Sequence, residues 1–145
     1  MQIEIRTMHV DDAESITFLT AQLGYNLPVY EIITNIKQIQ AAPGNLLLVA
    51  VCKSKIVGWI HAFKSIHIES KAFIEVCGLV VDEEYRGKGI GKALINEVKQ
   101  WCLNKGIYRL RLRTNVKRTE AHKFYQTLGF TEIKQQKVFE MNLVR

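Results

Sequence analysis

Three glycines stand at every second position in the middle of the chain, at Gly87, Gly89 and Gly91, among the basic residues Arg86, Lys88 and Lys92. They follow an apolar run and an acidic turn, and helical periodicity begins just after them. Such a loop can turn several backbone N–H groups towards one anion, and the dipole of the following helix adds to the attraction. Because glycine has no side chain, the backbone can also approach a phosphate closely. The stretch therefore predicts a cradle for a diphosphate.

Two common phosphate-binding loops do not match this stretch. The P-loop pattern G-x-x-x-x-G-K-[ST] fails because Ala93 follows Lys92, and the dinucleotide pattern G-x-G-x-x-G fails because the glycines are spaced by two. The pattern that matches is Arg-x-x-Gly-x-Gly, read at Arg86, Gly89 and Gly91. After a Val-rich strand with an acidic turn, this pattern resembles the acetyl-CoA loop of the GNAT superfamily of N-acetyltransferases.

A second segment supports the resemblance. The run A-H-K-F-Y-Q-T-L-G-F at residues 121–130 resembles the A-x-x-F-Y-x-x-x-G-F segment near the C-terminus of many members. Many members carry Asn three residues before that alanine, whereas this chain has Arg118, as in a subgroup with R-x-x-A-H-x-F-Y. Asn115 is a candidate to replace the missing Asn, so whether Asn115 or Arg118 contacts the coenzyme stays open.

Hydrophobic periodicity predicts the elements that position these motifs. Strands are expected over residues 2–7, 46–52, 56–63, 73–81, 108–113, 130–134 and 138–143, the last two as a hairpin. Helices are expected from Asp11 to Gly24, from Pro28 to just before Pro43, and over residues 89–104 and 119–128. Gly78, inside a strand, indicates a bulge or the close approach of a ligand.

The order of these elements is β-α-α-β-β-β-α-β-α-β-β, which is the GNAT order. It predicts an α/β (α+β) fold: a GNAT-like mixed, mostly antiparallel central sheet of about seven strands, flanked by about four helices. A length of 145 residues suits one domain, so residues 1–145 are expected to form a single N-acetyltransferase (GNAT) domain.

The charge balance suggests an anionic partner. The formal net charge is +6, so nucleic acid must be considered. The basic residues are spread along the chain, however, and a nucleic-acid-binding domain needs a reading helix or exposed aromatics flanked by charge. Trp101 instead falls on the core face of its helix. A coenzyme with several phosphate charges accounts for part of the excess.

Composition and cysteine spacing indicate a cytoplasmic protein. No apolar run approaches the roughly 20 residues that span a bilayer, and the N-terminus alternates like a strand instead of resembling a signal peptide. Cys52, Cys77 and Cys102 form neither a disulfide framework nor a zinc site. We expect buried thiols, with Cys77 as the exception to watch because its strand leads to the glycine loop.

The resemblance implies acetyl-CoA as co-substrate and no metal. In the family, the amide-rich pantetheine arm pairs like an added strand with the strand before the loop, and a bulge near Gly78 would free backbone groups for this pairing. A backbone N–H near Leu79 would then face the thioester oxygen. The residues expected to bind the coenzyme are Leu79, Val80, Val81, Arg86, Gly87, Lys88, Gly89, Ile90, Gly91, Lys92, Asn115 and Phe124.

Two residues are candidates for moving protons. The family carries a tyrosine at the place of Tyr125, and a phenol is protonated at neutral pH and can donate to the leaving thiolate; the alternative is a tyrosine that packs its helix. Glu75, a carboxylate among apolar residues, could accept the amine proton directly or through water; the alternative is a pair with a basic residue on a neighbouring strand. His61 and His67 are further candidates; the alternative for each is an ordinary strand or loop histidine.

The acceptor is expected between the first two helices and the final hairpin, with Tyr25, Asn26 and Tyr30 on its rim. The leading function is transfer of an acetyl group from acetyl-CoA to a primary amine of a small molecule or peptide, by direct attack. No covalent enzyme intermediate, membrane or nucleic acid is expected to take part, and a homodimer stays open. The alternatives are a non-catalytic coenzyme A sensor and a small basic nucleic-acid-binding domain.

Overall fold

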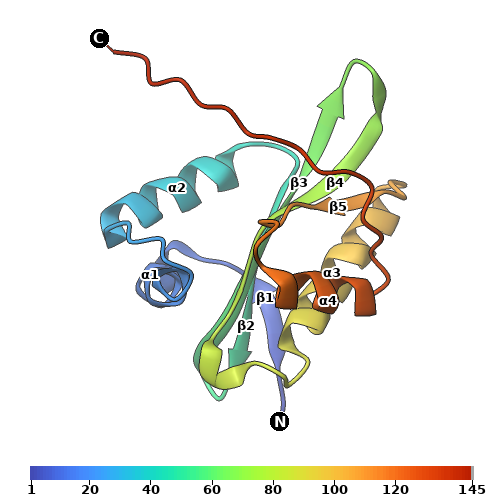
Figure 1. The fold of residues 1–145 in the computed structure, drawn as a ribbon. Helices are drawn as coiled ribbons and strands as arrows, with labels where there is room; N and C mark the ends of the chain where they lie inside the picture. The colour runs from blue at the N-terminus through green and yellow to red at the C-terminus, as the bar shows by residue number, and fades with distance from the viewer. Residues whose placement is uncertain (145) are drawn as a thin grey trace. The chain divides into compact units, whose positions relative to one another are not determined.

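A mixed sheet of five strands forms the centre of the N-terminal part of the molecule (Figure 1). The computed structural model describes residues 1–144, which form two compact units, residues 1–113 and residues 114–144. The strands are β1 (Glu4–Thr7), β2 (Asn45–Cys52), β3 (Lys55–His67), β4 (Ser70–Val81) and β5 (Leu110–Leu112). They lie in the order β1-β2-β3-β4-β5, and only the β4–β5 pair is parallel.

Tight turns join β2 to β3 and β3 to β4. Lys53 and Ser54 connect β2 to β3 with positive φ angles of 49° and 66°. Two consecutive residues with positive φ match the right-handed twist of the strands that they join. This turn puts β3 directly beside β2, and β3 continues through a second turn into β4.

Helices cover the two faces of this sheet. Figure 1 shows α1 (Ala13–Ala21) and α2 (Val29–Ala41) on one face and α3 (Ile90–Asn104) on the other. The apolar stripe of α3 is buried; it consists of Ile90, Leu94, Ile95, Val98 and Cys102. Trp101, which was expected on this core face, is only partly buried, and the Lys105 Nζ lies 5.0 Å from the centre of its ring. Because α3 connects β4 to the parallel strand β5, it forms the crossover that such a pair requires.

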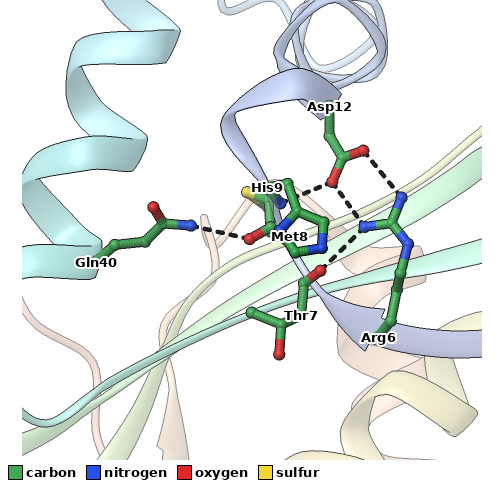
Figure 2. Close-up of polar contacts among 6 residues, drawn as sticks. All are labelled: Arg6, Thr7, Met8, His9, Asp12 and Gln40. Atoms are coloured by element: carbon green, nitrogen blue, oxygen red, sulfur yellow. Dashed lines mark hydrogen bonds and ion pairs between the residues drawn. The ribbon is translucent and has the colours of Figure 1, made fainter.

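An ion pair with a buried carboxylate joins β1 to the short 3-10 helix that follows it (Figure 2). Asp12 ends the short 3-10 helix η1 (Val10–Asp12), and its carboxylate accepts two hydrogen bonds from Arg6 of β1, at 2.8 and 2.9 Å. The same carboxylate accepts a hydrogen bond from the His9 backbone N–H at 2.8 Å. Gln40 of α2 donates to the Met8 carbonyl at 2.9 Å. These bonds fix the positions of α1 and α2 relative to β1.

The second unit contains α4 (Thr119–Thr127), which confirms the helix predicted there. The predicted hairpin is wrong: residues 130–144 contain no strand among the described residues. Val138, Phe139 and Met141 are 80–89% exposed. Alternating apolar residues form a strand only when the backbone finds a partner and one face is buried, and an isolated hairpin is marginal in water. The sheet therefore has five strands where the sequence suggested about seven.

The Arg6–Asp12 pair gives the first prediction. Burial alone would raise the pKa of Asp12, but the hydrogen bonds from Arg6 and His9 outweigh it, so the pKa lies below its ordinary value of 3.8. Asp12→Asn should lower the free energy of unfolding by about 2 kcal/mol at pH 7. The deficit should be complete above pH 3.8 and shrink as the pH falls further, because the wild-type carboxylate then becomes neutral too.

Urea denaturation at several pH values measures this effect. Asp11→Asn, a change at the exposed neighbouring position, is the matched control and should leave stability nearly unchanged. A deficit of equal size in both variants would contradict the assignment.

Candidate active site

The glycine loop connects the end of β4 to α3 and adopts the backbone shape that the sequence suggested. Gly87 and Gly89 have positive φ angles of 77° and 83°, which favour glycine. The first hydrogen bond of α3 runs from the Ala93 N–H to the Gly89 carbonyl at 3.0 Å. The N–H groups of the preceding turn, up to Lys92, therefore have no acceptor inside the helix. This end of α3 can bind an anion through its backbone.

Basic side chains surround the loop. Arg86, Lys88 and Lys92 are all exposed. The Arg86 Nε donates to the Val81 carbonyl at 3.3 Å, which holds its guanidinium at the end of β4. Lys88 lies 5.3 Å from the centre of the Tyr85 ring. Two of these cations are thus held near the loop by their neighbours.

Asp82, which the sequence did not single out, stabilises the turn that precedes the glycine loop. Asp82 is 2% exposed and caps the 3-10 helix η2 (Glu83–Tyr85) by accepting from the Glu84 N–H at 3.1 Å. Gln22 donates to the same carboxylate at 3.4 Å, and the Lys55 Nζ lies 3.6 Å from it. Its signal in the sequence is an acidic residue directly after an apolar strand, the position of a capping Asp.

The charge of Asp82 is held in place by its partners. Burial alone would raise the pKa of Asp82, but the Glu84 N–H, Gln22 and the cation of Lys55 outweigh burial and hold the pKa below its ordinary value. The Gln22 carbonyl also accepts from the Glu83 N–H at 2.9 Å. Contacts from α1 and β3 therefore fix the turn from which the glycine loop starts.

A β-bulge interrupts β4 just before the loop. His61 pairs with Gly78 and Ala62 with Val76, so Cys77 is the extra residue. Gly78 lies against an aromatic ring: a Cβ built on it would lie 2.7 Å from two ring atoms of Trp59. The bulge predicted from Gly78 is confirmed, and the cause of the glycine is the Trp59 ring.

The pairing of β4 with β5 ends before the bulge, where β5 itself ends. The described pairings between the two strands run from Ile74 with Leu110 to Val76 with Leu112 and end there. Leu79, Val80 and Val81 thus follow the last pair, with β3 as their partner on the other side. Val80 is 3% exposed and belongs to the core, whereas its neighbours Leu79 and Val81 on this edge are partly exposed. Such an edge can accept an extended, amide-rich molecule as an added strand.

Glu75 lies on β4 two residues before the bulge and is ion-paired. It is 9% exposed, and its Oε1 accepts from the Arg113 Nε at 2.8 Å. Arg113 directly follows β5, the neighbouring strand. Glu75 is thus paired with a basic residue next to a neighbouring strand, which was the alternative to its role as a base. Whether the same carboxylate also accepts a proton during turnover stays a prediction.

The structure brings together three polar side chains that the sequence analysis did not connect. They come from adjacent strands: Asn45 from β2, His61 from β3 and Cys77 from β4. The Cys77 Sγ lies 2.9 Å from the His61 Nδ1, and the His61 Nε2 lies 2.8 Å from the Asn45 Oδ1. Their separation in the sequence hid this cluster, because only the strand register makes them neighbours.

Tyr125 belongs to the second unit and packs within it. Its ring lies 5.4 Å from that of Phe124 and 6.0 Å from that of Phe130, centre to centre. Burial raises the pKa of Tyr125, and the cation of Arg118 opposes the shift only in part. The phenol is therefore protonated at neutral pH. Asn115 caps the preceding turn, since its Oδ1 accepts from the Lys117 N–H at 2.9 Å.

The residues predicted for the acceptor rim lie in and just after the connection between α1 and α2. Tyr25 is 65% and Tyr30 66% exposed, and the Asn26 side chain reaches only the Gly24 carbonyl, at 3.5 Å. Within residues 1–144, no hydrogen bond or ion pair joins them to the glycine loop or to Glu75. Their role in acceptor binding stays a prediction.

Comparison with known proteins identifies the family. The model described as the acetyltransferase (GNAT) family matches residues 10–130. This chain belongs to that family. N-acetylaspartate synthetase of Xenopus tropicalis is 35% identical over 91 residues, which are 63% of this chain but 32% of that protein. The GNAT chain thus spans about a third of this relative's length.

Solved structures agree on the fold of this GNAT chain. A transcriptional regulator from Bacillus halodurans C-125 is 22% identical with a TM-score of 0.87, over 97% of this chain and 100% of that one. The aminoglycoside N-acetyltransferase AAC(6')-Iy, in complex with CoA, is 23% identical with a TM-score of 0.86, over 98% and 96%. The predicted family and fold class are confirmed, whereas the predicted site residues stay predictions.

Two further observations concern the described part of this GNAT chain. Within residues 1–144, every helix is too short or too polar to cross a membrane. The same residues contain no group of three or more His, Cys, Asp or Glu side chains placed to hold a metal ion.

The contact between Gly78 and Trp59 gives the second prediction. Gly78→Ala should lower the free energy of unfolding by about 1–3 kcal/mol, because the new methyl group overlaps the Trp59 ring. Trp59→Leu removes that ring and lowers the free energy of unfolding by an amount of its own. Chemical denaturation of both single variants and the double variant gives the coupling. The double variant should lose less than the sum of the single losses, and strict additivity would contradict the contact.

Proposed function

We propose that this protein transfers an acetyl group from acetyl-CoA to a primary amine. The observation that carries the proposal is the combination of an anion-binding helix start with an adjacent sheet edge that β5 leaves after Val76. A coenzyme that carries both a diphosphate and an amide-rich arm needs these two features side by side. Membership of the acetyltransferase family supports the choice of acetyl-CoA.

Different residues bind different parts of the coenzyme. The backbone N–H groups and cations of residues 86–92 bind the diphosphate. The backbone of Leu79–Val81 pairs with the pantetheine arm, and a backbone N–H near Leu79 polarises the thioester oxygen. From the second unit, Asn115 and Phe124 also contact the coenzyme. Residues 1–145 thus act as one N-acetyltransferase domain that holds the donor.

The chemistry is attack of the neutral amine on the thioester carbon. Glu75 accepts the amine proton, directly or through a water molecule, and Tyr125 donates a proton to the leaving thiolate. The acceptor is a small-molecule or peptide amine at the rim formed by Tyr25, Asn26 and Tyr30. Neither a metal nor a covalent intermediate is needed for this route, because positioning of two substrates supplies much of the acceleration.

The basic residues near β5 are engaged within the protein, which argues against the nucleic-acid alternative. Arg111 lies 4.2 Å and Arg109 5.7 Å from the centre of the Phe73 ring, and Arg113 binds Glu75. We also propose a cytoplasmic location, since all three cysteines are free thiols and the cytosol keeps thiols reduced.

Acetyl-CoA binding at the glycine loop is the third prediction. Gly89→Asp should weaken the affinity for acetyl-CoA by about tenfold or more, roughly 1.4 kcal/mol, because it adds a negative charge at the cradle. Gly106→Asp is the matched control: Gly106 also has a positive φ, 69° against 83° for Gly89, and also has open space at its Cβ, but lies at the other end of α3. Isothermal titration calorimetry compares the variants. Equal losses in both would show strain alone and overturn the assignment of the loop.

The role of Tyr125 is the fourth prediction. Tyr125→Phe should lower kcat by about 10²-fold or more while acetyl-CoA affinity stays nearly unchanged, since only a proton donor is lost. Tyr108→Phe, at a position that is 81% exposed, controls for the loss of a hydroxyl. Turnover is followed as release of free thiol during an amine screen. Wild-type turnover in the Tyr125 variant would leave the tyrosine with a packing role, and binding without any turnover would favour the coenzyme sensor.

A further inference from the structure

A cysteine, a histidine and an asparagine form a hydrogen-bonded row across three neighbouring strands. The Cys77 sulfur lies 2.9 Å from the His61 Nδ1 and 3.5 Å from the His61 carbonyl oxygen. The other ring nitrogen of His61, Nε2, lies 2.8 Å from the Asn45 Oδ1. The same three groups, in the same order, serve papain-like proteases as nucleophile, base and orienting residue.

The hydrogen bonds of Asn45 determine where the protons lie. The Asn45 Nδ2 donates to the carbonyls of Ala42 and Pro43, at 3.3 and 3.4 Å, which turns the amide oxygen towards His61. An amide oxygen can only accept, so the His61 Nε2 carries the ring proton. The Nδ1 of a neutral imidazole then has a lone pair directed at the thiol. His61 is thus oriented to take the proton of Cys77.

The bulge makes Cys77 unlike the other two cysteines. Cys52 and Cys102 are buried, each 4% exposed, whereas Cys77 is exposed. Cys77 is the extra residue in β4, at the point where the pairing with β5 has ended. The thiol is therefore accessible beside the sheet edge to which the proposed function assigns the arm of the coenzyme.

We propose that Cys77 accepts an acetyl group from acetyl-CoA and forms an S-acetyl thioester on the protein. This proposal rests on the proposed function, because the thioester of the coenzyme must reach the edge of β4. The S-acetyl form arises when no amine occupies the acceptor site, so the thiol and the amine compete for the same acetyl group.

The step balances without any further reactant. A bond forms between the Cys77 sulfur and the carbonyl carbon, and the bond from that carbon to the coenzyme sulfur breaks. The thiol proton passes to the His61 Nδ1 and then to the departing sulfur, which leaves as the free thiol of coenzyme A. One thioester replaces another, so the reaction is close to equilibrium and an excess of free coenzyme A reverses it.

At rest Cys77 is a thiol and not a thiolate, so it must lose its proton during the attack. Although Cys77 as a residue is exposed, its sulfur is partly buried, and this burial, with a contribution from the charge of Glu75, raises the pKa of the Cys77 thiol to about 11. Burial also lowers the pKa of His61. Both groups are neutral at neutral pH, so the thiol resists general oxidation and becomes a nucleophile only as His61 removes its proton. A sulfur of high pKa is intrinsically a strong nucleophile once deprotonated.

The experiment is incubation of the whole protein with acetyl-CoA in the absence of an amine. Intact mass spectrometry followed by peptide mapping should show one acetyl group, on Cys77, with Cys52 and Cys102 unmodified. Excess free coenzyme A should remove it, which distinguishes a thioester from acetylated lysine. His61→Gln should slow the modification by about 10²-fold or more. Asn45→Ala should slow it less, and circular dichroism checks that both variants fold.

Calorimetry on the same samples separates this proposal from the proposed function. Binding of acetyl-CoA without any acetyl group on Cys77 overturns this proposal and leaves the proposed function standing. Absence of binding overturns both. Acetylation of Cys77 at the same rate in wild type and His61→Gln would show non-specific chemistry and would also overturn the proposal. Cys77→Ser, which lacks the thiol, should retain acetyl transfer to amines.

Discussion

One extra residue in β4, Cys77, shifts the register between β3 and β4, and the Trp59 ring occupies the space that a side chain at position 78 would need. A β-bulge bends its strand and leaves one residue unpaired. Pairing with β5 ends at Val76, directly before the bulge. The exposed thiol, its contact with His61 and the released sheet edge all depend on this one irregularity.

The end of β4 must also be held rigidly if the glycine loop is to meet the same ligand. Asp82 provides this, because its buried carboxylate joins the turn after β4 to Gln22, which directly follows α1, and to Lys55 at the start of β3. A buried charge is tolerated only when it is paired and hydrogen-bonded. The glycine loop and the start of α3 therefore have a defined position relative to the edge of β4.

The sequence was informative wherever a local pattern decides the structure. Periodicity located the helices and the five strands, and Gly78 indicated the bulge. Local patterns could not reveal the row of Asn45, His61 and Cys77, because strand register alone makes those residues neighbours. The predicted hairpin over residues 130–143 failed for the opposite reason: its alternating pattern was present, but pairing and burial are tertiary properties. The sequence identified Glu75 as a carboxylate in an apolar strand, but it could not identify Arg113 as the basic residue that pairs with it.

In the function proposed for this protein, the edge of β4 that the bulge releases binds the arm of the coenzyme. Amide hydrogen exchange at Leu79, Val80 and Val81, with and without saturating acetyl-CoA, tests it most directly. N–H groups that gain a hydrogen-bond acceptor exchange more slowly. We expect slower exchange at those of these three N–H groups that face the released edge, together with protection at Gly89–Lys92. Protection of the glycine loop alone, with exchange in β4 unchanged, would contradict it.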